Sequence, residues 1–189
     1  MLGNSFTYYN DMPKMLAAHL NDEVLAHTRG GAYLDEQYDP TTPMGGNTLE
    51  KLATESWDYV ILQEQSLAPV TQKERFLTNI KTLCELARKA GATPVLYATW
   101  AYQKGSEKLA STGMSYEEMA DALWASYRQA AEENNALIAP VGNTFQMLSP
   151  LLDLYMPDGF HPTLTGSDLA AKTLAGVIQK DKSTRHAAN

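Results

Sequence analysis

The sequence predicts an α/β fold in which a parallel β-sheet lies between two layers of helices, as a three-layer α/β/α sandwich. Short apolar runs rich in β-branched residues alternate along the chain with longer segments whose apolar residues recur every three or four positions. The first pattern is typical of buried strands and the second of amphipathic helices, and their alternation indicates βαβ crossovers. The length of 189 residues suits one domain, so we expect a single domain over residues 1–189.

The strands are expected where the apolar runs are short and β-branched. The first is unusual, because only Met1 and Leu2 precede a Gly-Asn-Ser turn, whereas a strand usually has about five residues. Either this first strand is truncated or the chain begins downstream of its natural start. The other expected strands cover residues 23–28, 58–62, 93–100 and 136–141.

The helices are expected where a capping residue or a proline precedes a periodic apolar stripe. Asp11-Met12-Pro13 begins the first helix, with the proline near the first turn. Four capping boxes predict further helix starts, at Asn47, Thr71, Ser115 and Thr165. A short helix over residues 144–148 is also predicted, residues 33–46 and 103–113 are expected to be loops, and residues 181–189 a frayed tail.

The composition argues against several classes of function. Lys and Arg number 15 against 22 Asp and Glu, and the net charge of −7 argues against binding to duplex nucleic acid, which needs a basic face. The single cysteine, Cys84, excludes a disulfide within the chain and lies on an apolar helical stripe, where a buried side chain is expected. No apolar run reaches the ~18 residues of a membrane-spanning helix, so no membrane partner is expected.

The start of the chain bears on cellular location. Met1-Leu2 leads directly into the first motif without the charged and apolar regions of a signal peptide. A cytoplasmic location is therefore expected, and a leader lost ahead of the truncated strand is the alternative.

Two segments near opposite ends of the chain carry the main chemical signal. Asp158 and His161 lie three positions apart in a segment, Pro157 to Pro162, that proline and glycine keep out of regular structure. In a tight turn the carboxylate can reach Nδ1 of the imidazole, and the other ring nitrogen can then take a proton from a nucleophile. Ser5, in Gly3-Asn4-Ser5-Phe6-Thr7, is the candidate nucleophile.

The expected sheet would bring five motif-bearing segments to one edge. Ligands of open parallel sheets bind at the carboxyl ends of the strands. The motifs all fall at such ends, and they cover residues 4–5, 29–31, 63–66, 100–102 and 158–161. Core packing does not explain this convergence, so an active site is predicted at this edge.

A serine near the start followed by Asp-x-x-His near the end resembles the order of the SGNH (GDSL-like) hydrolases. The resemblance covers Gly3 to about Ile178 and is narrower for a DUF4886-like branch, which has GNSFT in place of GDS and LQEQS in place of the usual G-x-N-D. It implies the SGNH hydrolase fold with a flavodoxin-like parallel sheet, and a serine esterase acting on carboxylic esters. In that scheme Ser5 is the nucleophile, His161 the general base and Asp158 the residue that orients the imidazole.

The same resemblance implies an oxyanion hole with three kinds of donor. They are the backbone N–H of Ser5, the N–H of a glycine after the second strand and a side-chain amide after the third. The glycine is Gly31 or Gly30, and a plain turn that requires positive φ is the alternative explanation of the pair. Gln65 aligns with the family's usual Asn, with Gln63 as the runner-up.

Other residues are assigned more loosely. Asn4 stands in place of the family's usual Asp, and a structural role at the Ser5 turn is favoured. Four aromatic residues are candidates for the walls of a substrate pocket, although each is individually more typical of ordinary packing: Tyr38, Trp100, Tyr102 and Phe160. Phosphate-binding glycine motifs are absent and the remaining histidines lack metal-ligand spacing, so no cofactor and no metal are expected.

The sequence therefore predicts a hydrolase of short O-acyl esters, O-acetyl groups on carbohydrates included, whose partner is a small-molecule or glycan ester. A short acyl group is expected because no apolar segment resembles an exposed lid. The alternative is a glycan-binding module that keeps the fold without turnover, which the short first strand and the atypical Gln65 favour. Oligomeric state is not indicated by the sequence.

Overall fold

The computed structural model describes residues 1–188, and in them it shows a sheet of five parallel strands in the order β2-β1-β3-β4-β5. Leu2 pairs with both His27 and Leu62, so β1 is a central strand although it is very short. This order is the flavodoxin-like one, and the predicted fold class is confirmed. The strands are β1 (Leu2–Gly3), β2 (His27–Thr28), β3 (Tyr59–Leu62), β4 (Thr93–Tyr97) and β5 (Leu137–Ala139).

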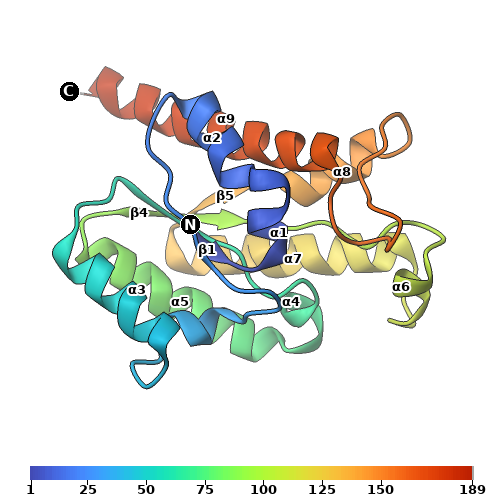
Figure 1. Cartoon of the computed structure of the whole chain (residues 1–189), viewed down its shortest axis with the longest axis horizontal. Helices are drawn as coiled ribbons and strands as arrows, with labels where there is room; N and C mark the ends of the chain where they lie inside the picture. The colour runs from blue at the N-terminus through green and yellow to red at the C-terminus, as the bar shows by residue number, and fades with distance from the viewer. Residues whose placement is uncertain (189) are drawn as a thin grey trace.

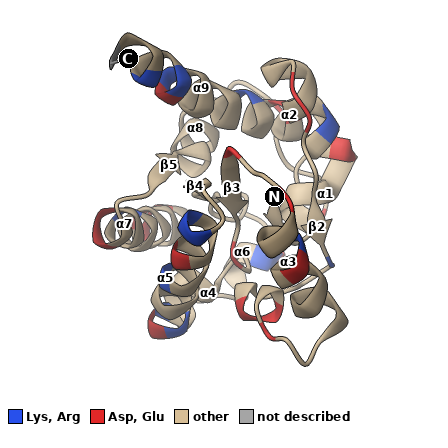
Figure 2. Ribbon diagram, turned by 90° about the vertical axis from the view of Figure 1, so that its left-hand side faces the viewer, with Lys and Arg blue, Asp and Glu red and all other residues tan. Residues whose placement is uncertain are grey.

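Helices cover both faces of the sheet (Figures 1 and 2). One face carries α2 (Met12–Leu20), α8 (Val141–Leu148) and α9 (Leu164–Ala188). The other carries α3 (Pro43–Thr54), α5 (Lys73–Lys89) and α7 (Tyr116–Asn134). Shorter pieces lie in the connections: α1 (Ser5–Tyr8), α4 (Ala68–Thr71), α6 (Glu107–Ala110) and the 3₁₀ helices η1 (Tyr9–Asp11) and η2 (Leu34–Gln37).

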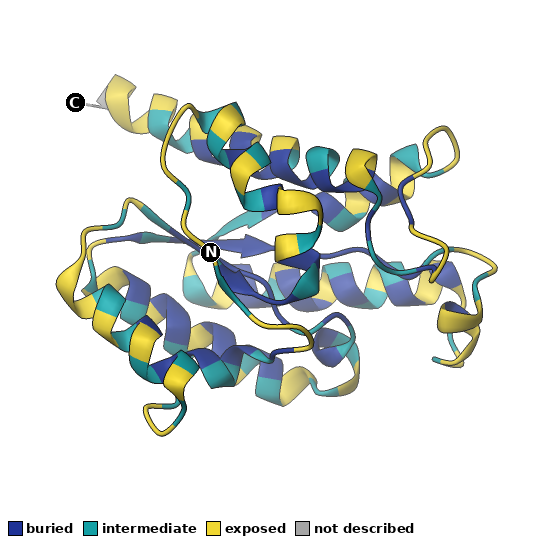
Figure 3. Cartoon of the chain, in the orientation of Figure 1, coloured by how far each residue is buried: buried dark blue, intermediate teal, exposed yellow. Residues whose placement is uncertain are grey.

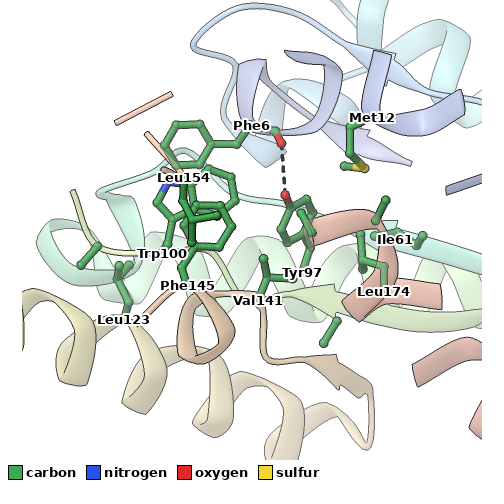
Figure 4. Packing of buried hydrophobic residues seen from close by; sticks show 14 of the residues in the cluster. Phe6, Met12, Ile61, Tyr97, Trp100, Leu123, Val141, Phe145, Leu154 and Leu174 are labelled. Carbon is green, nitrogen blue, oxygen red and sulfur yellow. Dashed lines mark hydrogen bonds between the residues drawn. The ribbon is translucent and has the colours of Figure 1, made fainter. Parts of the chain in front are cut away.

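The buried apolar residues form two core clusters. Figure 3 shows buried residues along the strands and along the helices that cover them. The cluster under α2, α8 and α9 contains a stack in which Trp100 lies between Phe6 and Phe145, with ring centroids 4.5 and 4.1 Å away (Figure 4). The hydroxyl of Tyr97 donates to the carbonyl oxygen of Phe6 at 3.2 Å in the same cluster. The opposite cluster contains Cys84, buried as predicted, and burial raises the pKa of its thiol to about 11.

Three of the four helix starts predicted from capping boxes are wrong, and the first two concern α3 and α5. Helix α3 begins at Pro43 and not at Asn47, because Thr42 accepts a hydrogen bond from the N–H of Gly45 at 3.0 Å and proline occupies the first turn. Thr71 belongs to α4, and Gln72 precedes α5. The capping box at Ser115 is confirmed for α7, with Glu118 completing it.

The last helix also differs from prediction at both ends. It begins at Leu164, and Thr163 rather than Thr165 holds its first turn, since the Thr163 hydroxyl accepts from the N–H of Gly166 at 3.1 Å. It continues through Ala188, where a frayed tail was expected from residue 181. Contacts of its last turns explain the order there: Asp181 accepts from the hydroxyl of Tyr59 at 2.8 Å, and Lys182 pairs with Asp22 at 2.9 Å. Asn189 lies outside the described residues.

The predicted strands and loops lie at the expected places in the chain, but their lengths differ from those predicted. Strand β5 ends at Ala139 rather than residue 141, since Pro140 has no N–H to continue the ladder, and α8 begins directly afterwards. Strand β2 is confined to two residues of the expected six, and β4 ends at Tyr97. The expected loops contain η2 and α6. None of the helices described is both long and apolar enough to cross a lipid bilayer.

Candidate active site

Ser5 lies in the first turn of α1, directly after the central strand β1. Asn4 caps this turn, because its side-chain oxygen accepts from the N–H of Phe6 at 3.2 Å. The side-chain amide of Asn4 also donates to the carbonyl oxygen of Ala32 at 3.1 Å, which ties the turn to the segment after β2. Asn4 therefore shapes the position of Ser5, as its expected structural role requires.

Asp158 and His161 lie together in the loop before α9. One carboxylate oxygen of Asp158 accepts from the backbone N–H groups of Phe160 and His161 at 3.1 and 3.0 Å, and the other lies 2.7 Å from Nδ1 of His161. Burial opposes ionisation of Asp158, but hydrogen bonds from the His161 ring and the two N–H groups outweigh it and lower the pKa of the carboxyl. The carboxylate is thus ionised and fixes the tautomer with a proton on Nδ1.

The other nitrogen of the imidazole faces the serine. Nε2 of His161 lies 2.9 Å from Oγ of Ser5, a contact that joins residues 156 positions apart. Because Nδ1–H points at Asp158, Nε2 is the acceptor for the serine hydroxyl. The three residues form a continuous chain of hydrogen bonds, in the arrangement of a nucleophile, a general base and an orienting acid.

The loop that carries His161 is held by the segment after β4. The indole N–H of Trp100 donates to the carbonyl oxygen of Phe160 at 3.0 Å, and the N–H of Gln103 donates to the carbonyl oxygen of Gly159 at 2.7 Å. Trp100 is fully buried. Its position explains why the imidazole is placed at the edge of the sheet rather than in solvent.

A cavity of about 320 Å³ opens beside Ser5 and His161. Its walls come from the ends of β1, β2 and β3 and from the histidine loop, and the lining residues are Asn4, Ser5, Phe6, Tyr8, Tyr9, Gly30, Gly31, Gln65, Ser66, Phe160 and His161. Four of the five segments predicted to converge therefore contribute to it, and the segment of residues 100–102 supports it from behind.

Backbone donors line this cavity. Gly31 has a φ of +69°, the left-handed conformation that the plain-turn explanation of the glycine pair requires. Among the described residues, none accepts a hydrogen bond from the N–H of Ser5, Gly30 or Gly31. The turn and the donor explanations of the glycines are thus compatible, because the same conformation leaves their N–H groups unpaired at the cavity.

Gln63 and Gln65 have different surroundings. Gln63 is fully buried, its side-chain oxygen accepts from the N–H of Asn4 and the hydroxyl of Thr7, both at 2.9 Å, and its amide donates to the backbone oxygen of Glu64. Gln65 lines the cavity. Its side-chain oxygen accepts from two N–H groups of the following turn at 2.9 and 3.0 Å, and its NH₂ has only a long contact of 3.5 Å, to Ser66. The NH₂ of Gln65 is therefore available at the cavity, whereas Gln63 is buried and is not among the lining residues.

Of the four aromatic candidates, Phe160 alone lines the cavity. Trp100 is in the core stack described above, and Tyr102 is buried behind the cavity, with its hydroxyl 2.8 Å from the Ser66 hydroxyl. Tyr38 lies elsewhere, where its hydroxyl donates to Asn79 at 2.8 Å. Tyr38, Trp100 and Tyr102 thus serve packing and support in this structure.

Sequence reasoning missed Tyr8, Tyr9 and the carboxylate of Glu64. The two tyrosines directly follow the Ser5 motif in the sequence, and this position could have identified them as residues of the site. Glu64 is fully buried and accepts from the N–H groups of Leu34 and Gln65 and from the amide of Asn79, at 2.7 to 3.0 Å. Burial raises the pKa of Glu64, and these hydrogen bonds counteract the rise. Its contacts join the segment after β2 to the segment after β3.

Within residues 1–188, no group of three or more His, Cys, Asp and Glu side chains is placed to hold a metal ion.

No family model and no curated protein matches this sequence. Several solved structures of other proteins do match this chain. A protein from Slackia heliotrinireducens that is provisionally assigned to the SGNH hydrolases is 43% identical, with a TM-score of 0.90 over 94% of this chain and 96% of its own. A DUF4886 family protein from Bacteroides uniformis is 18% identical, with a TM-score of 0.65 over 93% and 80% of the two chains.

A third neighbour is Axe2, an acetylxylan esterase from Geobacillus stearothermophilus, which is 14% identical with a TM-score of 0.64 over 94% of this chain and 91% of its own. At that identity it shows a shared fold alone, as the Bacteroides protein does. The Slackia protein matches almost the whole chain at far higher identity. On the basis of this match, the chain belongs to the SGNH (GDSL-like) hydrolase superfamily.

Proposed function

We propose that this protein is a serine ester hydrolase that removes short O-acyl groups, O-acetyl groups on carbohydrates included. The observation that carries the proposal is the pair of hydrogen bonds that joins Asp158 to His161 at 2.7 Å and His161 to Ser5 at 2.9 Å, at the wall of a cavity. Structural packing alone has no need of a serine hydroxyl aimed at an imidazole that a carboxylate already orients.

The reaction proceeds in two halves. Oγ of Ser5 attacks the carbonyl carbon of the ester while its proton passes to Nε2 of His161, and Asp158 stabilises the imidazolium that forms. His161 then gives that proton to the leaving alkoxide, so that the alcohol departs and the acyl group stays on Ser5. In the second half a water molecule gives a proton to His161 and attacks the acyl carbon, and the proton returns to Oγ as the acid leaves.

The negative charge on the carbonyl oxygen needs donors in both halves. At the cavity, the N–H of Ser5 and that of Gly31 (or Gly30) have no acceptor among the described residues. The NH₂ of Gln65 makes only one long contact, of 3.5 Å to the Ser66 hydroxyl. Donors that are already oriented cost no rearrangement when the charge develops. This supports the assignment of Ser5, Gly31 and Gln65 to the oxyanion hole.

The proposed substrate class follows from the cavity. Its volume of about 320 Å³ is at the low end for small-molecule sites, and the aromatic residues Tyr8, Tyr9 and Phe160 are among those that line it. Aromatic faces suit the apolar faces of sugar rings, and Axe2, which shares the fold, is named for its action on acetylxylan. A small acyl group on a carbohydrate is therefore the substrate class that we propose.

The test is covalent labelling with a fluorophosphonate, which modifies only serines that a base activates. The wild type should be labelled stoichiometrically at Ser5, and Ser5→Ala and His161→Ala should abolish both labelling and the hydrolysis of p-nitrophenyl acetate. The double variant should be little worse than either single variant, because the two residues share one proton transfer. Binding of glycans without labelling would instead indicate a module that keeps the fold without turnover.

A further inference from the structure

The ring of Tyr9 lies flat on the imidazole of His161. The two ring centroids are 4.2 Å apart and the planes differ by 5°, which is a parallel stack. The two hydrogen bonds of His161 both lie in the plane of its ring, because ring nitrogens bond along their in-plane lone pairs and N–H groups. These bonds restrain the ring at its edge only, and the face contact of Tyr9 adds a restraint perpendicular to the ring plane.

The backbone beyond Tyr9 is bent to make this contact. Asn10 and Asp11 both have a φ of 55°, in the left-handed region that side chains other than glycine seldom adopt. Two consecutive residues in this conformation cost free energy, and such strain persists only where the surroundings enforce it. Helix α1 ends at Tyr8, because Tyr9 has a ψ of 139° outside the helical range, and the bend that follows leads into α2.

The side chain of Asn10 holds this backbone conformation in place through two hydrogen bonds. Its NH₂ group donates to the carbonyl oxygen of Pro162 at 3.0 Å and to the hydroxyl of Ser167 at 2.9 Å. The Ser167 hydroxyl in turn donates to the carbonyl oxygen of Tyr9 at 3.3 Å, and Ser167 is buried. The residue after Tyr9 is thus tethered to the residue after His161, so that the two stacked rings belong to one hydrogen-bonded unit.

From these contacts we infer that Tyr9 is a positioning residue for His161, with Asn10 as the tether that holds it in place. The inference rests on the proposed function. The stacked ring keeps Nε2 of His161 aimed at Ser5, and when the imidazole takes the serine proton, the face of Tyr9 lies against the cation that forms. An aromatic face attracts a cation, so the contact is more favourable after proton transfer than before it. Its effect should therefore appear in the chemical step.

The experiment compares three versions of position 9. Tyr9→Phe keeps the ring and removes the hydroxyl, whereas Tyr9→Leu removes the ring. The saturating rate of fluorophosphonate labelling, and kcat for p-nitrophenyl acetate, should fall roughly three- to tenfold in Tyr9→Leu and clearly less in Tyr9→Phe. A residue that only binds substrate would change KM or the half-saturating concentration of the probe instead.

A spectroscopic readout is independent of turnover. A parallel aromatic ring shields the carbon-bound protons of His161, so their NMR signals should move downfield in Tyr9→Leu and not in Tyr9→Phe. Thermal unfolding shows whether each variant is folded. Asn10→Gly, which permits the left-handed backbone but lacks the tether, should also slow labelling, and Asn10→Ala, which disfavours that backbone as well, should slow it further.

The outcomes separate the two proposals. A labelled wild type with an equally fast Tyr9→Leu would overturn the role of Tyr9 and leave the proposed function standing. An equal loss in Tyr9→Phe and Tyr9→Leu would also overturn it, because the hydroxyl and not the stacked ring would then matter. An unlabelled wild type would overturn the proposed function and this inference together.

Discussion

Gln65 allows the proposed oxyanion hole to be tested by changing a single side chain. Its oxygen is held by two backbone N–H groups, so its NH₂ has a fixed direction at the cavity wall. Gln65→Leu keeps the bulk and removes the donor, and kcat for p-nitrophenyl acetate should fall by roughly a hundredfold or more. KM should move little, because the contact strengthens mainly in the transition state. Steady-state kinetics of the two proteins measures both values.

Gln63→Leu is the matched control two positions earlier. It leaves the N–H of Asn4 and the hydroxyl of Thr7 without their buried acceptor, so it should lower the free energy of unfolding by about 1–3 kcal/mol. Chemical denaturation measures that loss. A folded Gln63→Leu that loses kcat while Gln65→Leu retains it would assign the donor to Gln63, and wild-type rates in both would leave backbone N–H groups as the donors.

Asp158 makes stability depend on pH. Its pKa is lower in the folded protein than in the unfolded chain, where an aspartate titrates near ~3.9. Its contribution is therefore present above that value and is lost as pH falls from there through the folded pKa. The melting temperature of the wild type should exceed that of Asp158→Asn at pH 5, and the difference should shrink toward pH 3. A difference that stays constant between these pH values would contradict the lowered pKa.

In helix α3, the substitutions Thr42→Ala and Asn47→Ala form a matched pair that tests where this element begins. Thr42 accepts the N–H of Gly45, whereas Asn47, the start predicted from its capping box, lies exposed inside the helix. Thr42→Ala should cost about 1 kcal/mol of unfolding free energy. Asn47→Ala should cost nothing or stabilise slightly, because alanine is the better helix former. Urea unfolding of both variants checks this, and the reverse order would show that α3 begins where the sequence pattern placed it.

The misplaced helix starts have a common physical cause. A capping box is a local pattern, and residues 42–50 contain two plausible starts, at Thr42-Pro43 and at Asn47. The choice between them is made by contacts with distant parts of the chain: Thr48, inside α3, is buried and its hydroxyl donates to Gln37 at 2.8 Å. Ser115 was predicted correctly because no competing cap lies next to it. Local signals thus determined that a helix exists, and tertiary contacts determined its first residue.

At the scale of the molecule, we expect the cavity beside Ser5 to limit the length of the acyl chain that the proposed hydrolase accepts. Its volume of about 320 Å³ and its position at the sheet edge leave no long apolar channel among its lining residues. Hydrolysis of p-nitrophenyl acetate or butyrate should be faster than that of esters with acyl chains of about eight carbons or more. A series of esters compared by kcat/KM measures the preference, and a maximum at the long chains would contradict it.

Large apolar side chains are nevertheless exposed near the histidine loop, where the sequence suggested no apolar lid. They are Met147, Leu151, Leu152, Met156 and Leu164. None of them lines the cavity beside Ser5. The expectation of a short acyl group therefore rests on the cavity itself and not on the lack of exposed apolar residues.

The sequence predicted the architecture and the gathering of Ser5, Asp158 and His161 at one edge, because the order of strands and helices determines which loops meet. It could not distinguish an aromatic wall from an aromatic support. Trp100 and Phe160 differ in whether they face the cavity or the core, and that depends on side-chain direction in irregular loops, where no periodicity applies. Tyr9 was missed for the same reason, since its place against His161 depends on the left-handed bend at Asn10.

The hydrogen bond between residues 156 positions apart has a consequence for the synthesis of the protein. A ribosome delivers Ser5 and the central strand well before the loop of Asp158 and His161. Until that loop has emerged, a nascent chain carries a serine that nothing activates, and its sheet contacts are long-range ones that close slowly. Under the proposed function, Ser5 therefore gains its reactivity toward esters only after that loop has been synthesised, and a chain that ends before residue 158 is chemically silent at Ser5.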